Sequence, residues 1–311
     1  MINSLKQEAL KNGDKLDIFS VEILRKLKED IETFKKENKL NNFQNWITNK
    51  FYKLDLPDLE NEINSIIFVA IPHPAYAKVE FIAKGKKYNL MSLVMSDFER
   101  NEKYFKKFVE KQGYKITSAF GIPLKRLAVR SGFAVYGKNN ISYVENIGSF
   151  FSYKAYFSNI PCDDYEWNEI KIADNCNNCN ICFNKCPTGA IKKEKILINN
   201  EKCLTYFNES PKKIPEWVSK DAHHCLCECL KCQFYCPMNK DHIHNVDDSI
   251  KFSEEETQMI LSKKKYDEFS DDFKYKAKKL GINDFFEALP RNLKLLMDLE
   301  DESEGSINRN F

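Results

Sequence analysis

The spacing of the cysteines constrains this chain more than any other feature of its sequence. Residues 176–187 form a Cys-x2-Cys-x2-Cys-x3-Cys-Pro run, in which the cysteines are Cys176, Cys179, Cys182 and Cys186. In such a run the first three thiolates wrap one [4Fe–4S] cluster, and the fourth points at a neighbouring cluster. The run therefore predicts two adjacent [4Fe–4S] clusters.

A second motif, Cys229-x2-Cys232-x3-Cys236-Pro237, repeats the last three cysteine positions of the first. The repeat implies that the two motifs exchange one ligand each. We therefore expect Cys236 to join the first three cysteines around cluster 1, and Cys186 to join Cys229 and Cys232 around cluster 2.

The eighth ligand is left open by the spacing. A complete second motif needs a cysteine at position 226, and this residue is Leu226. The remaining candidates are Cys203, Cys225 and Cys227. Structural zinc, with His223 and His224 as further ligands, is the alternative reading, but zinc motifs do not require the third spaced cysteine or the Cys-Pro pair. We expect both histidines to be surface or loop residues, and Cys162 and the unused cysteines to be free buried thiols.

The distribution of cysteine also divides the chain, because residues 1–161 contain none. The first part alternates helical and strand patterns, which is typical of a layered α/β or α+β domain. We expect an α/β domain over residues 1–165, a ferredoxin-like domain with two clusters over residues 166–245, and a short helical segment over residues 246–311.

Hydrophobic periodicity predicts the individual elements. A long amphipathic helix is expected from Ile18, Val21, Leu24, Leu27, Ile31 and Phe34. Residues 65–71 predict a strand that is buried on both faces. Further helices are expected over residues 96–113 and 123–131, each ended by a glycine, and strands over residues 115–120, 141–144 and 150–157. Ser253 and Glu256 form a capping-box pattern that opens helical sequence continuing to about residue 299.

Composition excludes several classes of function. The 311 residues carry a formal charge of only +2, which argues against strong global attraction to nucleic acid or to an anionic membrane. The sequence contains neither an apolar span of membrane length nor a secretory leader, so we expect a cytoplasmic protein without a membrane partner.

Three segments resemble the epoxyqueuosine reductase family. They are AVRSGFAVYGKNN (residues 128–140), IGSFF (147–151) and KCLTY (202–206), and ALPRN (288–292) adds a weaker similarity. Members of this family, and the related reductive dehalogenases, bind cobalamin in a nitroreductase-like domain and supply it with electrons from two clusters. The resemblance implies an α+β fold with a nitroreductase-like layered domain, a two-cluster ferredoxin-like domain and a helical tail.

The resemblance also implies site residues. Cys203 stands where the family has its isolated cluster ligand, which makes cluster 2 the set Cys186, Cys203, Cys229 and Cys232. Five residues occupy the stretch that would line the corrinoid: Lys138, Ser142, Gly148, Ser149 and Tyr153.

Two departures from the family pattern bear on function. The family's catalytic aspartate aligns with Ser118, whose hydroxyl is a far weaker proton donor than a carboxylic acid. The C-terminal part is too short for the helical extension that the family uses on tRNA. Both departures count against tRNA as the substrate, and predict a divergent relative with a small-molecule or corrinoid-protein substrate.

We therefore expect a cobalamin-dependent iron–sulfur oxidoreductase, supplied with electrons by a donor such as a ferredoxin or a flavodoxin. An electron-transfer or corrinoid-activating protein without substrate chemistry of its own is the alternative. A flavin in the first domain is a third hypothesis. The lysine runs at 212–213 and 263–265 are interpreted as solvated charge.

Overall fold

The computed structural model describes residues 1–57, 62–193 and 196–304. The chain divides into unit 1, which comprises Met1–His73 and Ser96–Cys179, and unit 2, which comprises Pro74–Met95 and Asn180–Phe311. The elements of unit 1 are α1 (Ile2–Lys11), β1 (Lys15–Ser20), α2 (Ile23–Glu37), α3 (Asn42–Trp46), a π-helix (Ile47–Phe51), β2 (Ser65–Pro72), α4 (Phe98–Lys111), β5 (Ile116–Ser118), α5 (Leu124–Arg130), β6 (Val135–Tyr136), β7 (Ser142–Tyr143), β8 (Phe151–Ser158) and a 3-10 helix (Asp174–Cys176).

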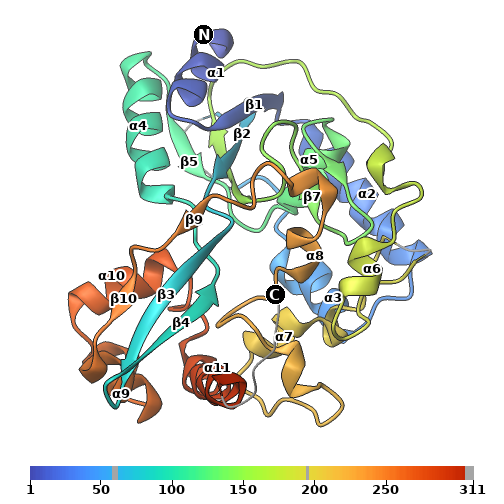
Figure 1. The fold of residues 1–311 in the computed structure, drawn as a ribbon. Helices are drawn as coiled ribbons and strands as arrows, with labels where there is room; N and C mark the ends of the chain where they lie inside the picture. Colours follow the sequence, from blue (N-terminus) through green and yellow to red (C-terminus); the bar gives the residue numbers. More distant parts are fainter. Residues whose placement is uncertain (58–61, 194–195, 305–311) are drawn as a thin grey trace. The chain divides into compact units, whose positions relative to one another are not determined.

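A four-stranded antiparallel sheet in the order β1-β2-β8-β5 forms the centre of unit 1. Its strand β2 is apolar at successive positions, so both faces of the strand are covered. Ile67, Val69 and Ile71 belong to the core that includes residues of α1 and α4. On the opposite face the ring of Phe68 packs 5.2 Å from that of Phe133 and 4.8 Å from that of Tyr153. Figure 1 shows α1 and α4 at one side of this sheet and α5 at the other. The expected doubly buried strand is confirmed.

The long N-terminal helix is the one element of unit 1 whose start was predicted wrongly. The helix α2 begins at Ile23, whereas Ile18 lies in β1 and pairs with Ile67 of β2. Ile18 has the spacing of the helical residues, but its backbone hydrogen bonds go to the sheet instead. The periodicity of a single segment cannot reveal a partner strand about 50 residues further along the chain.

The other predicted elements of unit 1 are confirmed within a few residues. Asp97 caps α4 by accepting a hydrogen bond from the backbone N–H of Arg100 at 2.8 Å. Gly113 and Gly132 follow α4 and α5 with φ of 82° and 77°, the left-handed conformation that ends a helix.

Unit 2 joins a β-hairpin to the cysteine-rich segment and the C-terminal helices. Its elements are β3 (Tyr76–Ala83), β4 (Lys86–Ser92), α6 (Ile181–Lys185), a 3-10 helix (Asn200–Lys202), α7 (Leu204–Asn208), a 3-10 helix (Lys220–Ala222), α8 (Lys231–Phe234), a 3-10 helix (Pro237–Asn239), β9 (Val246–Asp247), β10 (Lys251–Phe252), α9 (Glu254–Leu261), a 3-10 helix (Tyr266–Glu268), α10 (Asp271–Lys279), a 3-10 helix (Phe286–Ala288) and α11 (Leu289–Glu304). The strands β9 and β10 both pair with β3 in parallel.

The core of unit 2 combines segments that are far apart in the sequence. Phe81 of β3 stacks on Phe252 of β10 with ring centroids 4.8 Å apart, and Phe273 of α10 lies 5.2 Å from Phe252. The capping box at the start of α9 forms as predicted, because the Ser253 hydroxyl accepts from the Glu256 N–H and the Glu256 carboxylate accepts from the Ser253 N–H.

The predicted α+β class is confirmed, whereas the nitroreductase-like layering stays a prediction. The bounds of the three expected domains also stay predictions, although residues 74–95 are grouped with unit 2. No helix within the described ranges is long and apolar enough to cross a membrane.

Candidate iron–sulfur site

The four cysteines expected around cluster 2 come from three separate segments of unit 2. Cys186 directly follows α6, and Cys203 is the N-terminal capping residue of α7. Cys229 and Cys232 belong to α8 and the turn before it, where the Lys231 N–H donates to the Cys229 carbonyl at 2.8 Å. The two helices that carry the motifs, α6 and α8, contact one another.

These thiols influence one another electrostatically, and Cys182 of the first run acts on Cys232 as well. Burial raises the pKa of Cys229 to about 12, and repulsion from Cys203 and Cys186 contributes to the shift. Burial is also the main cause that raises the pKa of Cys232, with repulsion from Cys229 and Cys203 adding to it. Thiolates crowded in a poorly solvated site repel one another unless a cation neutralises them. Iron ions supply this charge, so the four residues fit a [4Fe–4S] cluster.

A network of side-chain amides holds the loop that leads to Cys229. Asn208 donates to the Glu228 carbonyl at 2.7 Å, and the Asn208 amide oxygen lies 3.1 Å from His223 Nδ1. Asn292 of α11 donates to the carbonyl of Asn208 at 2.7 Å and to that of Leu226 at 2.8 Å. His223 and His224 lie in a loop, as expected, but His223 is buried, because its ring takes part in this network.

The alternative candidates for the eighth ligand lie in a different environment. Cys227 belongs to the hydrophobic core of unit 2, where its thiol lies 3.5 Å from the Ser92 hydroxyl and 3.7 Å from the Leu280 carbonyl. Cys225 is 1% exposed, and burial raises its pKa well above the ordinary value. Cys162 is buried in the core of unit 1. All three are buried, as the sequence predicted, and their free state stays a prediction.

The first cysteine run is described partly in each unit. Cys176 and Cys179 lie in unit 1, where the Cys179 N–H donates to the Cys176 carbonyl at 3.2 Å. Cys182 and Cys236 lie in unit 2. Pro237 begins a 3-10 helix directly after Cys236. Pro187 begins no helix: α6 ends at Lys185, and a turn follows in which the Gly189 N–H donates to the Cys186 carbonyl.

The residues expected to line a corrinoid gather around one hairpin of unit 1. The Tyr153 hydroxyl of β8 donates to Ser142 Oγ of β7 at 3.1 Å, and burial raises the Tyr153 pKa. Gly148 closes a tight turn with Val144 and has a φ of 73°, and the neighbouring Ser149 is 7% exposed. Lys138 lies in the turn between β6 and β7. Ser118 ends β5, opposite Tyr156 of β8.

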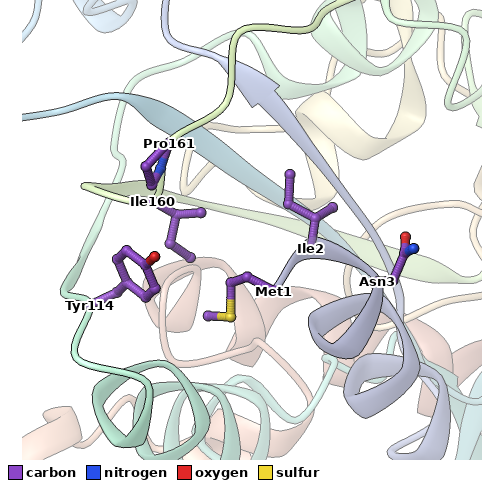
Figure 2. A pocket seen from close by; sticks show the side chains of 6 residues that line it. All are labelled: Met1, Ile2, Asn3, Tyr114, Ile160 and Pro161. Carbon is purple, nitrogen blue, oxygen red and sulfur yellow. The ribbon is translucent and has the colours of Figure 1, made fainter.

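A pocket of about 400 Å³ lies at another place in unit 1. It is lined by Met1, Ile2, Asn3, Tyr114, Ile160 and Pro161. Figure 2 shows mostly apolar side chains around it. None of the predicted site residues lines this pocket.

Among the described residues, no group of three or more His, Cys, Asp or Glu side chains is placed to hold a single metal ion.

The family described as a 4Fe-4S double cluster binding domain matches residues 175–239, a range that contains all eight predicted ligands. The chain is therefore an iron–sulfur protein with a domain for two [4Fe–4S] clusters, as the cysteine spacing predicted.

Comparison with whole proteins shows which enzymes this iron–sulfur protein resembles. An epoxyqueuosine reductase from Atelocyanobacterium thalassa is 25% identical over 66% of this chain and 71% of its own length. The enzyme of the same name from Cellulophaga algicola is 24% identical over 84% of this chain and 86% of its own length. One from Francisella cf. novicida is 32% identical, but over only 36% of this chain and 31% of its own length.

Solved structures share the fold. The epoxyqueuosine reductase of Streptococcus thermophilus matches 98% of this chain and 86% of its own, with a TM-score of 0.61 and 14% identity. A selenomethionine-labelled epoxyqueuosine reductase matches 96% and 82%, with a TM-score of 0.64 and 19% identity. This chain therefore resembles epoxyqueuosine reductases in sequence and shares their fold. The expectation of an oxidoreductase enzyme agrees with the names of these relatives.

Proposed function

We propose that this chain is an iron–sulfur reductase that passes electrons through two [4Fe–4S] clusters to a cobalamin cofactor. The observation that carries the proposal is the gathering of Cys186, Cys203, Cys229 and Cys232 in unit 2, where three separate segments bring their thiols together. These four are the proposed ligands of cluster 2. The proposed ligands of cluster 1, namely Cys176, Cys179, Cys182 and Cys236, rest on the spacing of the motif.

The corrinoid is proposed to bind at the hairpin of unit 1. Ser142, Ser149 and Tyr153 offer hydroxyl groups there, Gly148 offers a tight turn, and Lys138 lies at the tip of the same hairpin. The hydroxyl–hydroxyl pair of Tyr153 and Ser142 supplies polar groups that suit the amide substituents of a macrocycle. Cobalamin would supply the reducing cobalt centre, and the chain would bind and orient it.

The substrate is the part of the proposal on which the relatives bear most directly. One structural neighbour, with 19% identity and a TM-score of 0.60, is an epoxyqueuosine reductase solved with an epoxyqueuosine-modified tRNA stem loop. A modified tRNA is therefore the first substrate to test, although Ser118 cannot replace a carboxylic acid as proton donor. The lysine runs give little support for a dedicated RNA surface, because some of their ammonium groups already pair with carboxylates. Lys213 Nζ lies 3.6 Å from Glu216 Oε1, and Lys264 Nζ lies 3.3 Å from Glu268 Oε2.

Anaerobic purification from cells supplied with cobalamin tests this proposal. We expect roughly eight irons per chain, an electron paramagnetic resonance signal from two reduced clusters, and a changed corrinoid spectrum when cobalamin is added. Protein that contains zinc in place of iron would overturn the cluster assignment. If the protein contains both clusters but binds no corrinoid at micromolar concentration, cobalamin is excluded as its cofactor. The function that then remains is that of an electron-transfer protein.

A second candidate function is supported by Ser118. A chain without the family's acid could reduce the corrinoid of a partner protein and carry out no substrate chemistry itself. Reduced protein that reactivates an inactive corrinoid enzyme, yet converts neither modified tRNA nor a small molecule, would favour this function. Replacement of Ser118 by Asp then separates the two, because an acid gained at this position should produce turnover only in a chain that binds substrate.

A further inference from the structure

The ammonium group of Lys138 is directed at the first cysteine run. Lys138 Nζ donates a hydrogen bond to the Asn177 carbonyl at 3.2 Å and another to the Cys179 carbonyl at 3.4 Å. Both acceptors belong to the loop that carries Cys176 and Cys179, and all of these residues lie in unit 1. A charged donor on two carbonyls of one short loop restricts the conformations that this loop can adopt.

The turn that carries Lys138 is itself held tightly. The Gly137 N–H donates to the Ile141 carbonyl at 2.8 Å, and Lys125 Nζ donates to the carbonyl of Asn140 at 2.7 Å. A Cβ atom on Gly137 would lie 2.5 Å from Asn139 Oδ1 and 2.7 Å from the Tyr143 ring, so only glycine fits. Lys138 therefore starts from a backbone that can move little.

Backbone hydrogen bonds also join the hairpin of β6 and β7 to the segment that precedes Cys176. The Tyr136 N–H donates to the Lys171 carbonyl at 3.1 Å, and the Tyr136 carbonyl accepts from the Ala173 N–H at 2.8 Å. The Cys176 N–H then donates to the Ala173 carbonyl, also at 2.8 Å. The hairpin thus holds the chain before Cys176 through its backbone, and the chain after Cys176 through the Lys138 side chain.

We propose that Lys138 is a positioning residue for cluster 1, which fixes the loop of Cys176 and Cys179 and places a positive charge beside it. This inference rests on the proposed function, because it takes Cys176 and Cys179 as ligands of that cluster. A reduced cluster carries one more negative charge than an oxidised one, so a neighbouring cation stabilises the reduced form. Lys138 should therefore raise the reduction potential of cluster 1 and slow the loss of its iron.

The test compares Lys138→Met, Lys138→Arg and Lys171→Met in protein loaded with both clusters. Lys171 is the matched control, because its exposed side chain lies in the adjoining segment and makes no hydrogen bond that the structure describes. Two readouts are used: the midpoint potential of each cluster, from a redox titration followed by electron paramagnetic resonance, and the rate at which a chelator removes iron.

For Lys138→Met we expect one midpoint potential to become more negative while the other stays unchanged, which also shows that the protein is folded. About half of the iron should be lost roughly tenfold faster, the factor that corresponds to one charge-assisted hydrogen bond. Lys138→Arg should keep the midpoint potentials and the rate of iron loss of the wild type, and Lys171→Met should do the same.

The possible failures are distinguishable. If the wild-type protein loads two clusters and Lys138→Met matches it in both readouts, the inference on Lys138 is overturned and the proposed function stands. Equal shifts in Lys138→Met and Lys171→Met would also overturn it, because charge alone would then explain the effect. If the wild-type protein binds no iron, the proposed function itself fails.

Discussion

At the scale of single residues, the surroundings of each thiol separate proposed ligands from structural cysteines. The Cys203 thiolate is stabilised by the N–H groups of Thr205 and Tyr206, although burial raises its pKa overall. Repulsion from Cys186 acts on Cys203 as well, which places the two thiols near one another. Cys225 is more deeply buried, and repulsion from Cys227, Glu228 and Cys229 adds to the effect of burial on its pKa. Because Cys225 also has a proposed ligand among its charged neighbours, it is the greater exposure of Cys203, together with the family resemblance, that favours Cys203.

Replacement of Cys203 by Ala should remove cluster 2 alone. We expect the iron content of anaerobically purified protein to fall from roughly eight to about four per chain, because a cubane that loses one thiolate ligand is lost. The matched variant Cys225→Ala should keep its full iron content, although a small cavity will lower its stability. Iron analysis distinguishes the two, and loss of iron from Cys225→Ala but not from Cys203→Ala would reverse the assignment.

At the scale of elements, a buried carboxylate joins two helices of unit 1. Asp30 of α2 accepts from Arg126 and Arg130, which are one turn apart on α5, and the distances from Asp30 Oδ1 to the nearest nitrogens are 2.8 Å and 2.5 Å. Burial alone would raise the Asp30 pKa, but the hydrogen bonds and charges of both arginines outweigh it and lower the pKa. Because α5 immediately precedes the hairpin of Lys138, this contact contributes to the position of the proposed site.

The Asp30→Asn variant should be less stable than the wild type by about 3 kcal/mol, since it leaves Arg126 without its counter-charge and Arg130 with only the exposed carboxylate of Glu169. A lowered folded-state pKa gives stability that is complete above the unfolded-state value of about 3.9 and is lost only as pH falls through the folded-state value. The difference in free energy of unfolding between the wild type and Asp30→Asn should therefore be constant from pH 6 to pH 8. Urea unfolding at several pH values measures it, and a difference that grows with pH in this range would contradict the assignment.

At the scale of the whole molecule, the cysteine-rich segment of unit 2 is built into a larger hydrophobic core. Leu226 is 1% exposed and packs in the core that includes Val79 and Phe81 of β3 and Leu293 of α11. Its N–H donates to the Met91 carbonyl of β4 at 2.8 Å. The position at which a complete second motif has a ligand is thus occupied by a core residue.

A cysteine introduced at position 226 should therefore fail to act as a ligand. We expect the double variant Cys203→Ala, Leu226→Cys to keep the reduced iron content of Cys203→Ala, because the new thiol would remain in the core. Leu226→Cys alone serves as the control, with full iron content and a stability lower by roughly 1–3 kcal/mol. Recovery of iron in the double variant would show that residue 226 can reach cluster 2.

Several helices and strands could be predicted because their causes are local. The apolar run of β2, the caps of α4 and α9, and the glycines after α4 and α5 all act within a few residues. The hairpin β3–β4 was not predicted, although its strands pair across a short turn at Lys84 and Gly85. Its pairing with β9 and β10 has no local cause, because it involves residues about 170 positions away. The mistaken start of α2 has the same origin, since β1 exists only through its pairing with β2.

The sequence alone determined that this chain has a domain for two [4Fe–4S] clusters, because the identity and spacing of cysteines decide which clusters one loop can bind. It could not choose among Cys203, Cys225 and Cys227 without a family resemblance. Only the tertiary structure placed Leu226 and Cys227 in the core, Cys203 near Cys186, and Lys138 against the first cysteine loop. These contacts join residues that lie far apart in the chain, and packing in three dimensions rather than local propensity brings them together.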